Sequence, residues 1–326
     1  MFVQSVTVVI FAFLALHCTT ISGQFDPEPN NRPIIGILTQ EASIYLKKKL
    51  LPEKYSSYIA ASYVKFIEGA GARVVPIWIG KDEAYYRDIL NKINGVLWPG
   101  GTALFNRNNG YADAGYTIYK IAKQMNKDGD YFPILGICLG FELLAHVVAN
   151  RVESRRKCNS LSQTIPLNFT SGYRESRLFN DISDDIVEIL ETKKVTANFH
   201  QFCVTKNILK QTGTSNEFRI LSLNNDLDGI EFISSFEHVT LPFYGLQFHP
   251  EKNLYEWILG KKIPHGKNAI KVAQYFANFF VNEARKNVHE FSSKKEELES
   301  LIYNYQPTYT GLKNSSFVQC YMFKNK

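Results

Sequence analysis

The chain has 326 residues, 45% of them hydrophobic and 21% charged, which is the composition of a globular protein and excludes a disordered one. Lys and Arg exceed Asp and Glu by 37 − 31 = 6, an excess too mild over this length to indicate a nucleic-acid binder. Five cysteines are too few for a disulfide scaffold, and the length suffices for a large core without one.

The N-terminus has the pattern of a secretory signal peptide. Residues 1–25 contain no acidic or basic side chain, and an apolar run over 6–16 is followed by small residues up to Gly23. We predict a signal peptide over 1–23 and a single domain over 24–326; the alternative is an N-terminal anchor. The run is too short to span a bilayer, and no later segment is apolar enough to span one.

Two N-glycosylation acceptors agree with passage through the secretory pathway, with the lysosome or the extracellular space as the destination. Asn168 begins one of these triplets and Asn314 the other. Cleavage of the signal would remove Cys18, which leaves four cysteines in the mature chain.

Strands and helices alternate along the first half of the chain. Short β-branched runs predict strands, and apolar residues at helical spacing predict helices between them. This alternation is typical of a parallel α/β sheet with helices on both faces. The predicted strands are 33–39, 74–79, 95–98 and 132–137, and the predicted helices are 55–70, 82–91, 112–126 and 141–149.

The second half changes character. Three closely spaced strands are predicted at 217–223, 230–236 and 243–248, which indicates a mixed or antiparallel extension of the sheet. An amphipathic helix is predicted over 268–285, and the charge run over 294–299 is typical of a solvated helical face.

The segment Gly136-Ile137-Cys138-Leu139-Gly140 lies at a predicted strand-to-helix junction, which is the layout of a nucleophile elbow with cysteine as the nucleophile. The position near a helix N-terminus favours the thiolate of Cys138, and the Leu139 N–H can donate to an oxyanion. The alternative is a buried structural cysteine at a glycine-bounded strand end.

A nucleophilic cysteine needs a base, and two histidines are candidates. His249 ends a predicted strand, and Glu251 lies close enough in sequence to hold its second ring nitrogen; the alternative is a surface turn. His200 could be a supporting group or an ordinary hydrogen-bonded residue. Cys138, His200 and His249 show no close-spaced pair of zinc ligands, so we expect no metal and no cofactor.

Together with the Pro99-Gly100-Gly101 turn, these motifs resemble the class I glutamine amidotransferase fold, a three-layer sandwich with a mostly parallel central sheet. Longer segments narrow the resemblance to the gamma-glutamyl hydrolase family and cover most of the predicted mature chain. Among them are PIIGILTQE, NGVLWPGG, PILGICLGFELL, ANFHQF and YGLQFHPEKNLYEW.

The resemblance implies a cysteine-type peptidase that hydrolyses γ-glutamyl bonds of folyl and antifolyl poly-γ-glutamates, and it allows a homodimer. It assigns Cys138 as nucleophile, His249 as acid/base, Glu251 as the group that orients His249, and His200 as a supporting residue. By the same resemblance, Tyr63 and Glu142 fall at substrate-binding positions, and the amides of Gly100 and Gly101 join Leu139 in the oxyanion hole.

Several alternatives stay open at this level. A glutaminase subunit that feeds ammonia to a synthase, or a non-catalytic binding protein, could share the fold. Cys158, Cys203 and Cys320 allow at most one disulfide, of unknown pairing. We also hypothesise that basic residues such as Arg174 and Arg177 receive the anionic polyglutamate tail.

Overall fold

The computed structural model describes residues 29–42, 55–311 and 315–324. The predicted signal peptide and Asn314 therefore lie outside the described residues. Among the described residues, no helix combines the length and the apolar character that a membrane crossing would need.

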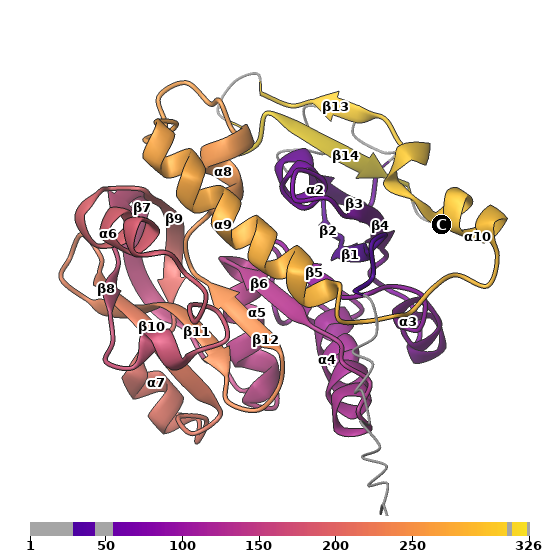
Figure 1. The fold of residues 1–326 in the computed structure, drawn as a ribbon, viewed down its shortest axis with the longest axis horizontal. Helices are drawn as coiled ribbons and strands as arrows, with labels where there is room; N and C mark the ends of the chain where they lie inside the picture. Colours follow the sequence, from indigo (N-terminus) through magenta and orange to yellow (C-terminus); the bar gives the residue numbers. More distant parts are fainter. Residues whose placement is uncertain (1–28, 43–54, 312–314, 325–326) are drawn as a thin grey trace, which may run out of the picture.

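An eight-stranded sheet with the order β4-β1-β5-β6-β12-β11-β10-β8 forms the centre of the molecule (Figure 1). The first five of these strands are parallel to their neighbours, and β11, β10 and β8 extend the sheet in antiparallel pairing. The mostly parallel sheet with an antiparallel extension is therefore confirmed. Its strands are β1 (Ile34–Leu38), β4 (Arg73–Ile77), β5 (Val96–Trp98), β6 (Ile134–Ile137), β8 (Asn168–Phe169), β10 (Phe218–Asn225), β11 (Glu231–His238) and β12 (Phe243–Leu246).

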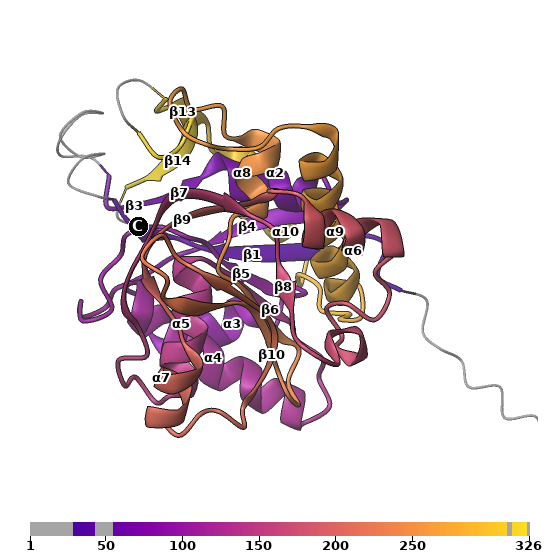
Figure 2. The same cartoon turned by 90° about the vertical axis from the view of Figure 1, so that its left-hand side faces the viewer.

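Helices cover both faces of the sheet, as the alternating pattern predicted. Figure 2 shows α2 (Ala61–Glu68), α8 (Pro250–Tyr255) and α9 (Lys267–Ala284) on one side of the sheet, with α3 (Glu83–Leu90), α4 (Tyr111–Lys127) and α5 (Leu139–Val148) on the other. Two apolar clusters fill the spaces between the helices and the sheet. α2, α4 and α9 each bury a mostly apolar face, which is the arrangement that their sequence pattern requires.

The prediction of one helix over 55–70 is wrong in its first part. Ser57–Ala60 forms strand β3, and helix α2 begins only at Ala61. This short apolar stretch pairs with β14 (Gln319–Phe323) and with β2 (Gln40–Glu41), and β13 (Pro307–Tyr309) completes a second, four-stranded sheet. The pairing partners lie far away in sequence, so local spacing favoured the helix.

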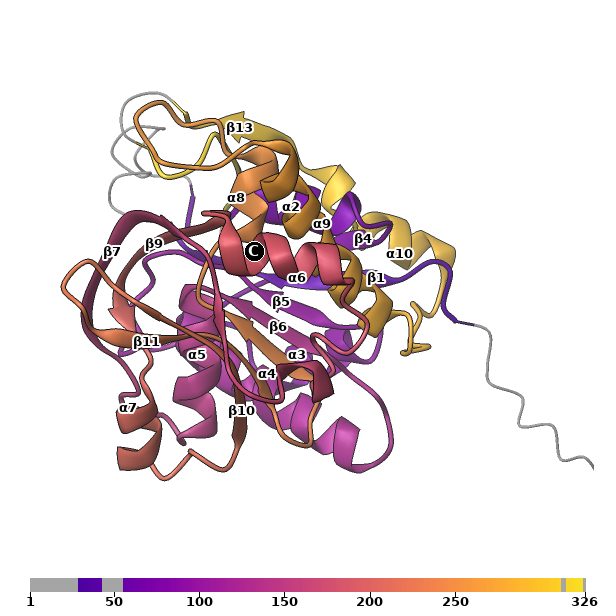
Figure 3. The ribbon, with the colours of Figure 1, turned by 60° about the vertical axis from the view of Figure 1, so that its left-hand side comes forward.

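A two-stranded antiparallel ribbon of β7 (Arg156–Ile165) and β9 (Thr196–Cys203) was absent from the sequence prediction. β7 is largely polar and half-exposed, and β9 mixes polar with apolar side chains, so neither has the apolar run of a buried strand. Figure 3 shows the ribbon beside the main sheet and α6 (Asp184–Thr192) next to α9. Within the described ranges the remaining α-helices are α7 (Lys206–Gln211) and α10 (Lys294–Ser300), and α10 carries the predicted charge run.

Candidate active site

The candidate site lies where three neighbouring parallel strands end. β5, β6 and β12 are adjacent in the sheet, and they are followed by the Pro99-Gly100-Gly101 turn, by Cys138 and by His249. The carboxyl ends of parallel strands meet at one edge, where open α/β sheets bind their ligands. A methyl group built on Gly100 would lie 2.8 Å from Cε1 of His249 and 3.0 Å from Cβ of Cys138, so the three residues meet.

Cys138 occupies a strained elbow between β6 and α5. Its φ of 52° and ψ of −105° are unusual for a residue with a side chain. The turn is closed by glycines, because a Cβ on Gly136 would lie 2.4 Å from the Gly140 carbonyl oxygen and a Cβ on Gly140 2.0 Å from that of Trp98. The glycines on both sides of Cys138 thus let strand and helix approach closely, as the motif predicted.

The thiol of Cys138 is protonated at rest. Burial, together with the charges of Glu142 and Glu251, raises the pKa of Cys138 well above its ordinary value. The Leu139 N–H and the ammonium of Lys252 lower this pKa, but they do not outweigh desolvation. The N–H at the helix N-terminus thus favours the thiolate, as expected, but burial outweighs it, so the reaction requires a base that removes the proton.

His249 is oriented to act as that base. Its Nδ1 lies 2.6 Å from Oε1 of Glu251 and 3.3 Å from the Tyr63 hydroxyl, while Nε2 has no hydrogen-bond partner among the described residues. Burial lowers the pKa of His249 although the Glu251 charge raises it. A neutral imidazole that donates from Nδ1 to Glu251 keeps the Nε2 lone pair available.

The Pro99-Gly100-Gly101 turn is held by side chains from other elements. Gln40 Nε2 donates to the carbonyl oxygens of Pro99 (2.9 Å) and Gly100 (3.0 Å), and the Tyr111 hydroxyl also donates to Pro99. The Gly100 N–H donates to the Tyr63 hydroxyl at 2.8 Å, so this amide is already engaged. Gly101 lines the cavity that contains Cys138.

Glu142 lies in the first turn of α5 and is buried behind the elbow. Its carboxylate accepts from Gln247 Nε2 and from Arg155 Nη1, each at 3.3 Å. Burial raises the pKa of Glu142 to about 7 against the opposing charge of Arg155. Glu142 is not among the residues that line the cavity, and it acts on Cys138 through its charge.

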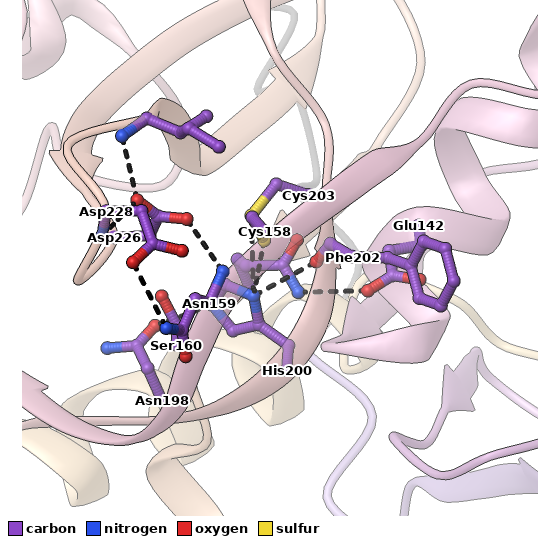
Figure 4. Close-up of a disulfide and its surroundings, with 12 residues drawn as sticks. Glu142, Cys158, Asn159, Ser160, Asn198, His200, Phe202, Cys203, Asp226 and Asp228 are labelled. Atoms are coloured by element: carbon purple, nitrogen blue, oxygen red, sulfur yellow. Dashed lines mark hydrogen bonds between the residues drawn. A yellow bond between two sulfur atoms is a disulfide. The ribbon is translucent and has the colours of Figure 1, made fainter.

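His200 is buried on β9 beside a disulfide (Figure 4). Its Nδ1 lies 3.0 Å from the Phe202 carbonyl oxygen and 3.5 Å from each sulfur of the Cys158–Cys203 disulfide, and its Nε2 lies 3.2 Å from Asn198 Oδ1. Burial, assisted by the nearby His249, lowers the pKa of His200 to about 3. The ring is therefore neutral and has a single N–H, which we place on Nδ1 because the Phe202 carbonyl oxygen can only accept; Nε2 then faces the side-chain amide of Asn198.

The disulfide also explains one cluster of metal-ligand type. The sulfur atoms of Cys158 and Cys203 and a ring nitrogen of His200 lie within 4.8 Å of one another. Because the two sulfurs are bonded to each other, they offer no thiolate. The pairing that the sequence left open is thus Cys158 with Cys203, and Cys320 is a buried free thiol.

A cavity of about 350 Å³ opens beside Cys138 and His249. Alternate residues of β9, Phe199 and Gln201, line it, while His200 between them faces the other side. Sequence reasoning did not identify most of the cavity wall, because its residues come from loops and edges far apart in the chain. The remaining residues that line it include Tyr58, Leu161, Lys252, Ile258, Lys261, Ile263 and Phe317.

The hypothesis that Arg174 and Arg177 receive the substrate tail is wrong. Neither residue lines the cavity. Arg177 donates to the carbonyl oxygens of His238 and Leu241, which lie before the first residue of β12 and thus at the sheet edge opposite to Cys138. Arg174 forms an ion pair with Asp184.

Asn168, the glycosylation candidate within the described residues, is exposed on β8. The Cys158–Cys203 disulfide agrees with an oxidising compartment. The chain therefore has features of a protein of the secretory pathway.

The chain matches a protein-family model and several solved structures. The family model described as Peptidase C26 matches residues 33–251. Among solved structures, a glutamine amidotransferase from Methylobacillus flagellatus is 10% identical, covers 79% of this chain and 96% of its own, and has a TM-score of 0.43.

Curated relatives match over nearly the whole length. The gamma-glutamyl hydrolase of Homo sapiens is 43% identical, with 90% of each chain covered, and that of Rattus norvegicus is 42% identical, with 93% of each covered. Gamma-glutamyl hydrolase B of Dictyostelium discoideum is 39% identical over 90% of this chain and 84% of its own. The chain belongs to the gamma-glutamyl hydrolase family, Peptidase C26.

Proposed function

We propose that this enzyme hydrolyses γ-glutamyl bonds of folylpoly-γ-glutamates, with Cys138 as nucleophile and His249 as acid/base. The observation that carries this proposal is the meeting of a strained cysteine elbow with a histidine whose Nδ1 is held by Glu251 and whose Nε2 is unengaged among the described residues. A nucleophile, a base and an orienting group in this order are the parts that acyl transfer requires.

The first step forms a thioester. His249 Nε2 takes the proton of the Cys138 thiol while the sulfur attacks the γ-carbonyl carbon of a glutamyl residue. The carbonyl oxygen becomes an oxyanion, which we assign to the N–H groups of Leu139 and Gly101. Since the Gly100 N–H donates to Tyr63, we give Gly100 the role of shaping the turn rather than of a donor.

The tetrahedral intermediate then collapses. His249 gives its proton to the nitrogen of the leaving glutamate, the C–N bond breaks, and the acyl group stays on Cys138. Water, deprotonated by His249, attacks the thioester, and the thiol is regenerated. The γ-carboxamide of glutamine and a γ-glutamyl peptide bond share this acyl half, so a fold that serves glutaminases suits this bond equally.

The remaining site residues support these groups. We propose that Glu251 fixes the tautomer of His249, that Tyr63 links His249 to the turn, and that Gln40 holds the turn in place. We assign to Glu142 a negative charge behind the elbow, paired with Arg155, and no contact with substrate. His200 acts through β9, because the Ala197 carbonyl oxygen of that strand accepts from the His249 N–H at 2.9 Å.

We further propose that residues 1–23 are removed and that the enzyme works in the lysosome or outside the cell. The lowered pKa of His249 supports this, because its imidazole stays neutral, and thus basic, to a lower pH than an ordinary histidine.

Product analysis of a folyl-penta-γ-glutamate digest tests the proposal. We expect shortened folyl-γ-glutamates together with glutamate or γ-linked oligoglutamate, and no products with Cys138→Ala of unchanged thermal stability. Release of ammonia from free glutamine without cleavage of the γ-linked chain would instead identify a glutaminase. Near-native cleavage by the folded Cys138→Ala variant would rule out the mechanism.

A further inference from the structure

Lys252 is a buried lysine in the wall of the catalytic cavity. It follows Glu251 on α8, is 4% exposed, and lines the same cavity as Cys138 and His249. Its ammonium makes one described hydrogen bond, to the Ser316 carbonyl oxygen at 3.1 Å. An ammonium has three donors, so the structure leaves part of its hydrogen-bonding capacity for another acceptor.

Two aromatic rings lie against this ammonium. Nζ lies 4.4 Å from the ring centre of Phe317 and 5.7 Å from that of Phe199. Among the described residues no carboxylate oxygen lies within 4.0 Å of it, whereas the partly buried cations Arg73, Lys92 and Arg155 each have such a partner. A buried charge without a counter-ion is costly, so binding an anion here would be favourable.

The nearby carboxylates are committed elsewhere. Glu251 holds His249, and Glu256 Oε2 accepts from the Val318 N–H. The positive charge of Lys252 nevertheless reaches the reacting groups, because it lowers the pKa of both Cys138 and His249. An anion bound to Lys252 would therefore sit within electrostatic range of the nucleophile.

We propose that Lys252 binds the α-carboxylate of the glutamyl residue whose γ-carbonyl is attacked by Cys138. This inference rests on the proposed function, since that residue carries both groups. Only its Cα and methylene carbons separate the γ-carbonyl from the α-carboxylate, so one cavity can hold the carbonyl at Cys138 and the carboxylate at Lys252. Lys252 thereby makes a free α-carboxylate a requirement for efficient acylation.

A purely structural role makes a different prediction. In that role, Lys252 would do no more than hold the segment at Ser316 and Phe317 against α8. Its loss would then reduce turnover of every substrate by the same factor, whereas a carboxylate receptor changes the preference between substrates that differ in this carboxylate alone.

The test compares kcat/KM for folyl-γ-diglutamate with two analogues, each with one α-carboxylate converted to a carboxamide. In one analogue the change is on the acylated residue, and in the other it is on the leaving residue. We expect the wild type to disfavour the first analogue by about 10- to 100-fold, the range of one charge-assisted hydrogen bond. In Lys252→Met this penalty falls to about 3-fold or less, and Lys252→Arg keeps most of it.

Lys261→Met is the matched control, because Lys261 is an exposed lysine that lines the same cavity. The ratio of kcat/KM for the unmodified substrate to that for the first analogue should be the same in Lys261→Met as in the wild type, even if the overall rate differs. An undiminished penalty in folded, active Lys252→Met would overturn the inference, as would a loss of discrimination only at the leaving residue. Failure of the wild type to cleave the unmodified γ-linked substrate would overturn the proposed function as well, so the two failures are distinguishable.

Discussion

Two buried histidines lie close to one edge of the sheet, and their surroundings differ. His249, at the end of β12, has one ring nitrogen on Glu251 and the other without a partner among the described residues. His200, on β9, has both ring nitrogens engaged and packs against the Cys158–Cys203 disulfide. Burial lowers the pKa of each, so both are neutral at rest.

The difference shows that burial and proximity do not by themselves make a histidine a base. Proton transfer needs a nitrogen whose lone pair faces the reacting group, and a second nitrogen that is held so that the tautomer is fixed. His249 meets the second condition through Glu251, and its Nε2, without a partner among the described residues, is available to meet the first. Both nitrogens of His200 face other groups, so it fails the first condition, and we propose that its contribution passes through β9, whose Ala197 carbonyl oxygen accepts from the His249 N–H.

The largest expected effect on turnover comes from replacing His249, and it distinguishes this histidine from His200. His249→Gln removes the acid/base group, so kcat should fall by about 10²–10⁴-fold. Steady-state kinetics on a γ-linked diglutamyl substrate measures this loss, with thermal unfolding as the control for folding. A loss under about 10-fold would remove His249 from the chemistry.

A smaller effect is expected from His200→Gln. This change alters the packing behind β9 and can shift His249. We therefore expect kcat to fall by up to about 10²-fold. The variant should also melt at a lower temperature, because both buried ring nitrogens have partners. A loss equal to that of His249→Gln, without any loss of stability, would break the distinction between the two histidines.

The disulfide beside His200 should matter more for stability than for turnover. The double variant Cys158→Ser and Cys203→Ser opens a loop with a sequence separation of 45, and the chain-entropy relation gives a loss of about 4 kcal/mol in the free energy of unfolding. We expect kcat to fall by less than about 10-fold at temperatures where the variant is folded, since neither cysteine lines the cavity. Denaturant unfolding and kinetics on the same preparation check both statements.

The smallest effect is a shift of the pH profile. Burial lowers the pKa of His249, so the acid limb of kcat/KM should lie below the ordinary histidine value of about 6.5. The Glu251 charge raises this pKa, and Glu251→Gln should therefore move the acid limb to still lower pH, whatever the loss in kcat. An acid limb that moves to higher pH in the variant would contradict the assigned pairing.

The same contrast explains what the sequence could predict. The strands β1, β4, β5 and β6 are short and apolar, so their existence and parallel arrangement followed from pattern alone. The strand β12 was predicted too, but as part of the mixed or antiparallel extension, whereas it pairs in parallel with β6. Cys138 and His249 both lie at strand ends, and adjacent parallel strands bring such ends together. The geometry around Cys138 also depends on flanking glycines that are visible in the sequence.

The structure around His200 was harder to predict from the sequence. β7 is largely polar and half-exposed and β9 mixes polar with apolar side chains, so nothing local marks them as strands, and the pairing of Cys158 with Cys203 depends on their register. The hydrogen bond from the Gly100 N–H likewise could not be predicted from the sequence, because it depends on where Tyr63 lies in the fold. The error on Arg174 and Arg177 has the same origin, because charge alone does not say at which edge of the sheet a side chain lies.

The most direct test of the account is mass spectrometry of the acid-quenched reaction with a γ-linked substrate. A thioester on Cys138 predicts a transient mass increase equal to the acyl half of the substrate, mapped by peptide analysis to Cys138 and absent in Cys138→Ala. Steady cleavage of the γ-linked bond with no adduct on Cys138, and with turnover retained by Cys138→Ala, would contradict it.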